Sequence, residues 1–172
     1  MTKVYVSIGS NIDRERHITA ALDALAKNFS ALEISSVYES EAVGFTGDHF
    51  FNLVVGFDTA MKVSELSACL RDVEHINGRN RGLEHFSART LDIDILTYGY
   101  YVGENDGVVL PRAEILENAF VLLPLAEIAP SQEHPVAHQS FSALWLAYSK
   151  QQKLWTVDFS WRGESISKSQ QA

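Results

Sequence analysis

Alternating apolar and polar residues at the start of the chain predict a β-strand that ends in a tight turn. Val4, Val6 and Ile8 are separated by single residues, and Gly9-Ser10-Asn11 then interrupts the alternation. Apolar residues recur next at the spacing of an amphipathic helix over residues 14–28. Runs rich in β-branched and aromatic residues predict three further strands, over residues 32–38, 50–57 and 92–98.

A second helix is predicted between the third and fourth strands. Its apolar stripe begins at Leu66 and ends at Ile76, with Ser64 as a candidate N-cap and Gly78 as the residue that ends the helix. The element order is therefore β-α-β-β-α-β. This order is typical of the α+β class and of the ferredoxin-like split βαβ arrangement, in which two helices pack on one face of an antiparallel sheet.

The last third of the chain predicts shorter elements. They are helices over residues 113–116, 118–123 and 141–148, and a strand over residues 154–159. Residues 163–172 are rich in Ser and Gln, and we expect them to form a disordered tail. We expect residues 1–162 to form a single domain, because the sequence shows neither an internal repeat nor a linker.

Composition narrows the class of protein and its partners. Of the 172 residues, 46% are apolar and 21% are charged, which is typical of one packed core. The net charge of −8 argues against a nucleic-acid partner, because non-specific phosphate binding needs clustered Lys and Arg. We see neither a signal peptide nor an apolar run long enough to span a membrane. With a single cysteine, Cys69, the sequence favours a cytoplasmic protein, and we expect a monomer.

Asp92 and Asp94 are the first candidates for chemistry. They are two residues apart in a predicted strand, so their side chains point to the same face. Two neighbouring, partly buried carboxylates repel each other unless one takes up a proton or a cation binds. Mg²⁺ suits this pair, because it prefers oxygen ligands and takes others from substrate phosphates. The alternative is a strand edge at which one aspartate faces solvent and has no function.

Three arginines precede the aspartates in a loop with glycines. They are Arg79, Arg81 and Arg89. Guanidinium groups bind phosphate with two parallel hydrogen bonds and stay charged. Carboxylates for a metal next to arginines for phosphate are typical of phosphoryl transfer, which depends mostly on positioning and charge neutralisation. The alternative is a solvated loop with local ion pairs, for which Glu74 and Glu84 are available.

Residues 87–96, Ser-Ala-Arg-Thr-Leu-Asp-Ile-Asp-Ile-Leu, resemble the signature of the 6-hydroxymethyl-7,8-dihydropterin pyrophosphokinase family. The resemblance extends over about residues 3–130 and agrees with the predicted fold. Further matching positions are Gly9-Ser10-Asn11, Tyr38, Asn52, Glu74, Arg79, Arg81, Pro111, Phe120 and the run from Pro124 to Pro130. The resemblance implies an enzyme of folate biosynthesis that transfers pyrophosphate from Mg-ATP to the hydroxymethyl group of a reduced pterin.

The resemblance also implies roles for single residues. Asp92 and Asp94 would hold two Mg²⁺ ions, and Asp94 would help to deprotonate the pterin hydroxyl. Arg79 and Arg89 would neutralise phosphate charge during transfer. The implied nucleotide-binding residues are Glu74, Arg81, Phe86, Ile95 and Arg112.

Five residues are implied to bind the pterin: Ser40, Val43, Phe50, Asn52 and Phe120. Phe50 and Phe120 would stack on the two faces of the ring, and Asn52 would hydrogen-bond its polar rim. Ser40 and Val43 would contact the rest of the rim, mainly through backbone groups. Taken without the resemblance, the two phenylalanines are more simply interpreted as core residues.

The sequence departs from the family pattern mainly on the ATP side. Phe86 stands where a tryptophan is expected, Arg112-Ala113 where a histidine and an aromatic residue are expected, and Asn118 where an arginine is expected. Ser87-Ala88 replaces Gly-Pro, and Glu41-Ala42 stands where prolines are common. We therefore expect weak ATP binding with intact transfer chemistry.

Two other functions fit parts of the sequence. The first is a divergent relative that acts on, or only binds, another pterin. The second is a ferredoxin-like module that binds protein or RNA. The acidic charge and the absence of a basic, aromatic sheet motif argue against the second function.

Overall fold

The computed structural model describes residues 1–41, 49–78 and 90–170. Its elements in chain order are β1 (Thr2–Ser10), α1 (Arg14–Asn28), β2 (Glu33–Ile34), β3 (Tyr38–Ser40), β4 (Phe50–Thr59), α2 (Val63–Ile76), β5 (Asp92–Tyr98), β6 (Gly103–Asn105), β7 (Val108–Leu110), α3 (Glu114–Glu117), α4 (Ala119–Ile128), α5 (Phe141–Leu146), β8 (Leu154–Thr156), β9 (Phe159–Trp161) and β10 (Glu164–Ser167). None of the helices in this part of the chain is long and apolar enough to cross a membrane.

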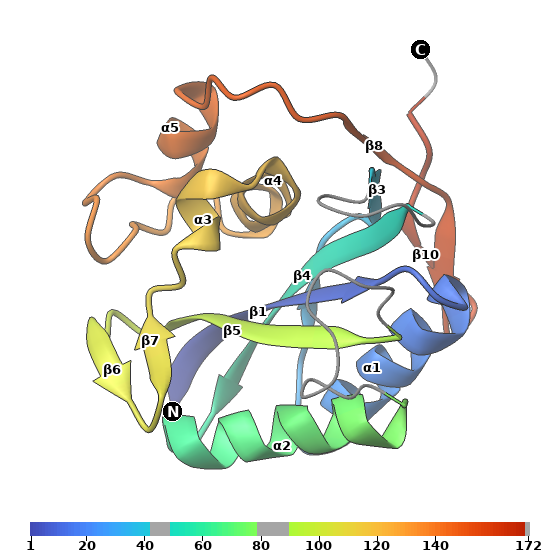
Figure 1. Ribbon diagram of the computed structural model, residues 1–172, viewed down its shortest axis with the longest axis horizontal. Coiled ribbons are helices and arrows are strands. Elements are labelled where there is room, and N and C mark those ends of the chain that lie inside the picture. The colour runs from blue at the N-terminus through green and yellow to red at the C-terminus, as the bar shows by residue number, and fades with distance from the viewer. Residues whose placement is uncertain (42–48, 79–89, 171–172) are drawn as a thin grey trace.

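The main sheet has the strand order of the split βαβ arrangement. β5, β1, β4 and β3 lie side by side, each antiparallel to its neighbour, and β8 pairs with the free edge of β3 (Figure 1). The short β2 pairs with β4 upstream of β3. Each long helix therefore connects two parallel strands with one antiparallel strand between them. The predicted α+β, ferredoxin-like fold is confirmed.

One face of the sheet packs on α1 and α2, as predicted. The alternating residues Val4, Val6 and Ile8 of β1 point into this core and are fully buried. Phe29, just after α1, stacks on Phe57 of β4 with their ring centroids 4.0 Å apart. Burial of side chains of this size contributes about 1.5–3 kcal/mol each, so this layer holds much of the stability.

The opposite face is covered by α3, α4 and α5. These three helices were predicted from the sequence, but their packing as a second layer on the sheet was not. Tyr5, Val54 and Leu96 lie on this face, in one buried cluster with Leu122 of α4 and Phe141 of α5. Figure 1 shows these three helices on the side of the sheet away from α2. Burial on both faces explains why β4 is apolar almost throughout, without the alternation of a one-sided strand.

Several element boundaries differ from those predicted. The strand expected over residues 32–38 is divided into β2 and β3, because the buried Ser35 Oγ accepts the backbone N–H of Val54 at 2.9 Å and distorts the ladder. α2 begins at Val63, one residue before the expected cap. α4 continues beyond the expected residue 123, with Pro124 inside it. Its apolar burial outweighs the cost of the proline, about 3 kcal/mol.

The C-terminal segment is ordered where a disordered tail was expected. The strand expected over residues 154–159 is two strands, β8 and β9, and residues 164–167 form β10, which pairs with β9. Ser167 fixes this hairpin to the sheet, because its buried Oγ accepts the N–H of Val37 at 2.9 Å. The expectation of disorder was therefore wrong for residues 164–167. A Ser-rich composition did not show that one serine side chain finds backbone partners in the sheet.

Candidate functional site on the sheet

Strand pairing brings the two aspartates next to the residues predicted to bind the pterin. Asp92 pairs with Gly9 of β1, and Gly9 pairs on its other side with Asn52 of β4. Asp94 and Phe50 lie two residues from Asp92 and Asn52, respectively, and so share their face of the sheet. Residues of three strands therefore form one row across this face, with polar side chains at its two ends.

This row lies beyond the part of the sheet that the C-terminal helices cover. Asp92, Asp94 and Leu96 are successive residues of one face of β5, and Leu96 is fully buried in the cluster with α4 and α5. The two aspartates are partly exposed. The cluster thus supports the site from one side, and the aspartates lie where its packing ends.

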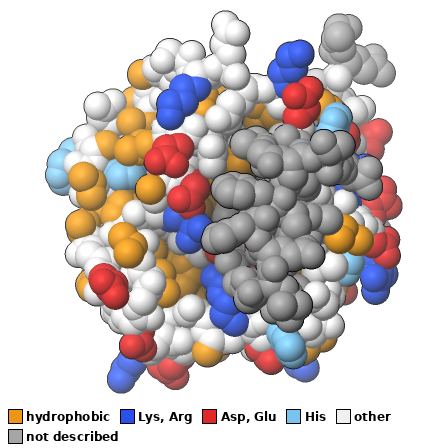
Figure 2. Space-filling model, viewed as in Figure 1, with side chains coloured by type: hydrophobic (Ala, Val, Ile, Leu, Met, Phe, Trp, Pro, Cys, Tyr) orange, Lys and Arg blue, Asp and Glu red, His pale blue; other side chains and the backbone are white. Residues whose placement is uncertain are grey.

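Asp94 is partly buried and is contacted by two arginines of other elements. Its side chain is 16% exposed, and its Oδ1 lies 3.3 Å from Nη2 of Arg71 and 3.8 Å from Nη1 of Arg112. Arg112 also pairs with Glu114 and donates its backbone N–H to Leu96 O at 2.9 Å. Acidic and basic side chains lie next to one another on the face viewed in Figure 2. Asp94 is thus a carboxylate already surrounded by positive charge.

Glu74 ties α2 to the strand that carries the aspartates. Its side chain is 2% exposed. One oxygen accepts Nη1 of Arg71 at 2.6 Å, and the other accepts the backbone N–H of Ile93 at 2.6 Å. Because Ile93 lies between Asp92 and Asp94, this bond fixes the backbone from which both carboxylates project. Arg71 was not among the site residues predicted from the sequence, although its i, i+3 spacing from Glu74 is a signal for an ion pair.

Two of the residues predicted to bind the pterin form a compact polar corner. Asn52 and Ser40 are buried, and Asn52 Nδ2 donates to Ser40 Oγ at 2.9 Å. Gly9 makes room for them, since an added Cβ would lie 2.9 Å from Asn52 Oδ1. Phe50, on the same face as Asn52, and Phe120 at the start of α4 are both partly exposed. Partial exposure leaves both rings accessible to a ligand, unlike fully buried core residues.

The remaining predicted site residues divide into two groups. The Ile95 side chain is 3% exposed and lies in the core under α1 and α2, on the face opposite to the aspartates. Only its backbone could therefore contact a nucleotide. The other five positions lie outside the described residues: Val43, Arg79, Arg81, Phe86 and Arg89.

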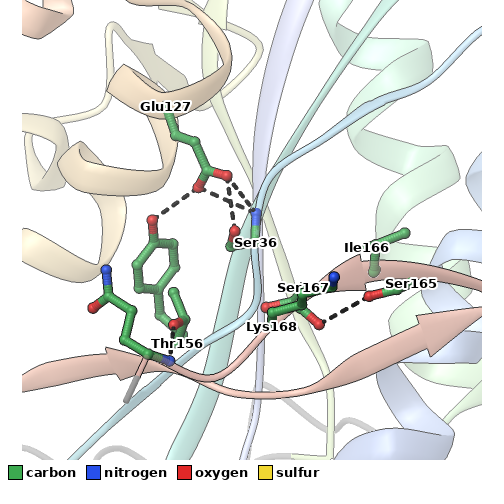
Figure 3. Close-up of a pocket in the computed structure, with 9 residues that line it drawn as sticks. Ser36, Glu127, Thr156, Ser165, Ile166, Ser167 and Lys168 are labelled. Carbon is green, nitrogen blue, oxygen red and sulfur yellow. Dashed lines mark hydrogen bonds between the residues drawn. The ribbon is translucent and has the colours of Figure 1, made fainter. Parts of the chain in front are cut away.

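A separate pocket of about 500 Å³ lies between α4, β3 and the C-terminal strands (Figure 3). Glu127 projects toward it from α4 and accepts hydrogen bonds from Ser36 N, Ser36 Oγ and Tyr38 Oη. Burial raises the pKa of Tyr38, and the bond to Glu127 raises it further, so the phenol stays a donor. With three donors on its carboxylate, Glu127 joins α4 to β3 and is not a candidate for catalysis.

Comparison with known proteins identifies the family. Residues 5–130 match the model of 7,8-dihydro-6-hydroxymethylpterin-pyrophosphokinase, HPPK. The chain belongs to the HPPK family. It is 35% identical to a 2-amino-4-hydroxy-6-hydroxymethyldihydropteridine pyrophosphokinase of Pseudomonas aeruginosa, over 77% of this chain and 84% of that protein. It is 33% identical to the protein of the same name from Bacillus subtilis, over 75% of this chain and 79% of that protein.

Solved structures of HPPK-containing proteins share the fold. A Plasmodium falciparum HPPK-DHPS, the A437G variant with pteroate, superposes with a TM-score of 0.69 at 13% identity. The match covers 86% of this chain and 43% of that longer protein. At this identity the likeness supports the fold alone.

The residues present fit a magnesium site. Asp92 and Asp94 supply hard oxygen ligands from one face of a strand, which is the donor type that Mg²⁺ prefers. Arg71 and Arg112 pair with Asp94 in this structure, so a metal ion on this carboxylate would compete with both guanidinium groups. Within the described ranges no group of three or more His, Cys, Asp or Glu could hold a metal by itself. A magnesium ion here would take its other ligands from water and phosphates.

Proposed function

We propose that this chain transfers pyrophosphate from Mg-ATP to the hydroxymethyl group of 6-hydroxymethyl-7,8-dihydropterin, in folate biosynthesis. The products are the pterin diphosphate and AMP. Membership of the HPPK family supports this function. The observation that carries it is the pair Asp92 and Asp94, which lies on one face of β5 next to arginines on one side and Asn52 on the other. Nothing observed favours a divergent relative or an RNA-binding module.

In the reaction the hydroxymethyl oxygen attacks the β-phosphorus of ATP. The bond from that phosphorus to the α,β-bridging oxygen breaks, and AMP leaves. Asp92 and Asp94 would hold two magnesium ions, which when bound neutralise phosphate charge and orient the phosphates. Asp94 accepts the hydroxymethyl proton. Arg112 stabilises the charge on the phosphates, together with Arg79 and Arg89.

The pterin ring lies between Phe50 and Phe120. Stacking on two aromatic faces suits a flat heteroaromatic ring, whose edge carries the polar groups. Asn52 bonds that edge, and its contact with Ser40 Oγ fixes the orientation of its amide. Ser40 and Val43 complete the contacts through backbone groups. Arg81, Phe86, Glu74 and the Ile95 backbone belong to the nucleotide side. We further propose a cytoplasmic monomer without nucleic-acid or membrane partners.

The direct test is an assay for AMP. Purified protein is incubated with Mg-ATP and 6-hydroxymethyl-7,8-dihydropterin, and the nucleotides and pterins are separated by chromatography. We expect equal amounts of AMP and pterin diphosphate to form, and neither to form with EDTA. Release of ADP instead of AMP, or no turnover at all, would contradict the proposed reaction.

Replacing Gly9 by alanine tests the pterin corner separately. The added methyl group would lie 2.9 Å from Asn52 Oδ1, so Asn52 has to move out of its bond with Ser40. We expect the KM for the pterin to rise about tenfold, the value of one hydrogen bond, with the KM for ATP unchanged. Steady-state kinetics with each substrate varied in turn provide the measurement. An equal rise in both KM values would show that the change is not confined to the pterin side.

A further inference from the structure

Arg71 links a structural carboxylate to the proposed metal site. Its Nη1 donates to Glu74 Oε1 at 2.6 Å, and its Nη2 donates to Asp94 Oδ1 at 3.3 Å. The guanidinium therefore lies between a helix residue and a strand residue that are far apart in the sequence. It is also one of the two cations that contact Asp94 within the part of the chain that the structure describes.

The hydrogen bond from Arg71 to Asp94 is easier to break than the one from Arg71 to Glu74. The Glu74 side chain is buried and its second oxygen accepts the N–H of Ile93, so Glu74 cannot follow a moving partner. The bond to Asp94 is longer, and Asp94 Oδ1 also lies near Arg112. The Arg71 side chain is 37% exposed. It can therefore leave Asp94 and keep its bond to Glu74.

Arrival of Mg-ATP changes the charges around this guanidinium. A divalent cation on Asp94 repels a second cation that lies within hydrogen-bonding distance of the same carboxylate. The triphosphate that comes with the metal carries several negative charges, and its oxygens offer guanidinium the same charge-assisted hydrogen bonds that a carboxylate does. Both effects move Arg71 in the same direction, away from Asp94 and toward the nucleotide.

We propose that Arg71 is a phosphate-binding residue of this enzyme: it neutralises Asp94 in the ligand-free state and contacts a phosphate oxygen of ATP when magnesium binds. The inference rests on the proposed function. Arg71 would provide a positive charge for ATP, which the uncharged residues Ala113 and Asn118 do not provide. Glu74 then has a second role, because it holds the stem of Arg71 in the position from which both partners can be reached.

The test uses three variants of the full chain. Arg71→Gln removes the charge and keeps a hydrogen-bond donor, whereas Arg71→Lys keeps the charge. Arg16→Gln is the matched control, because Arg16 of α1 forms an exposed i, i+3 ion pair with Asp13, the residue just before that helix. Each protein is titrated with Mn²⁺ alone, followed by electron paramagnetic resonance, and with a non-hydrolysable ATP analogue in the presence of Mg²⁺, followed by calorimetry. Thermal unfolding checks that each variant is folded.

The proposal predicts opposite changes in the two titrations. Arg71→Gln is expected to bind the ATP analogue about 10- to 100-fold more weakly, because a charged phosphate contact is lost. It is expected to bind Mn²⁺ alone about fivefold more tightly, because a competing cation has left Asp94. Arg71→Lys should lose less analogue affinity than Arg71→Gln, and Arg16→Gln should match the wild type. If Arg71→Gln does not fold, Arg71→Lys provides the test, and weaker Mn²⁺ binding in Arg71→Lys than in the wild type overturns the proposal.

Two results would overturn the role of Arg71. One is unchanged analogue binding in Arg71→Gln, and the other is a loss of Mn²⁺ and analogue binding together, as expected from a purely structural residue. Failure of the proposed function is a separate result, since the wild type would then form no AMP. Neither titration depends on turnover, so the two failures are distinguishable.

Discussion

Replacement of Asp94 by asparagine is expected to lower the rate of pyrophosphoryl transfer by about 10³-fold. Asparagine keeps the size of the side chain and one oxygen. It removes the negative charge that faces Arg71 and Arg112, and with it the metal ligand and the group that accepts the hydroxymethyl proton. The measurement is AMP formation under saturating Mg-ATP and pterin. The loss is expected mainly in kcat, because the charge acts on the phosphates during transfer.

Asp106→Asn is the matched control for this variant. Asp106 is exposed, lies in the turn between β6 and β7, and has a backbone φ of 54°, a conformation that asparagine tolerates well. We expect this variant to keep full activity and stability. If Asp94→Asn retained a rate close to that of the wild type, Asp94 would be neither a metal ligand nor a proton acceptor, and the mechanism would need another carboxylate.

Replacement of Glu74 by alanine is expected to lower the free energy of unfolding by about 3 kcal/mol. The change removes the acceptor of the Ile93 N–H and the ion pair between Glu74 and Arg71. Among the residues that the structure describes, Arg71 then keeps its ion pair with Asp94. Each lost interaction costs more stability than the same loss at an exposed position of a helix, because the Glu74 carboxylate is buried. Urea unfolding followed by tryptophan fluorescence provides the measurement.

Asp72→Ala is the control on the same helix. Asp72 is exposed, and its loss is expected to change the free energy of unfolding by less than about 0.5 kcal/mol. A similarly small effect of Glu74→Ala would show that the bond to Ile93 is replaced by water. Activity in the folded fraction of Glu74→Ala is a second readout, since β5 is then less firmly held and the two aspartates lose their fixed spacing.

The order of the strands and the two long helices along the chain could be predicted from the sequence, because the signals for these elements are local. The alternation of Val4, Val6 and Ile8 and the apolar stripe of α2 each specify an element without reference to the rest of the chain. The second helical layer could not be predicted in the same way. α4 is apolar on nearly all sides and contains Pro124, so its sequence lacks the amphipathic period that shows which face is buried.

The aspartate pair could be predicted because strand geometry alone places Asp92 and Asp94 on one face. The surroundings of the pair depend on tertiary contacts that no spacing reveals. Arg71 precedes Asp94 by 23 residues, and only the packing of α2 against β5 brings them to 3.3 Å. Ile95 was predicted from its position in the motif, but its side chain lies in the core. A motif position alone does not show whether the side chain or the backbone faces the ligand.

The position of Glu74 also affects how the molecule behaves in a crowded solution. β5 is the last strand of its sheet, and a strand at an edge offers its outward N–H and C=O groups to strands of other molecules. Here the Ile93 N–H is bound by Glu74, and the Leu96 carbonyl is bound by the backbone N–H of Arg112. Two outward groups of this edge are therefore already paired. The same contacts that hold the aspartates in place protect the sheet from edge-to-edge aggregation.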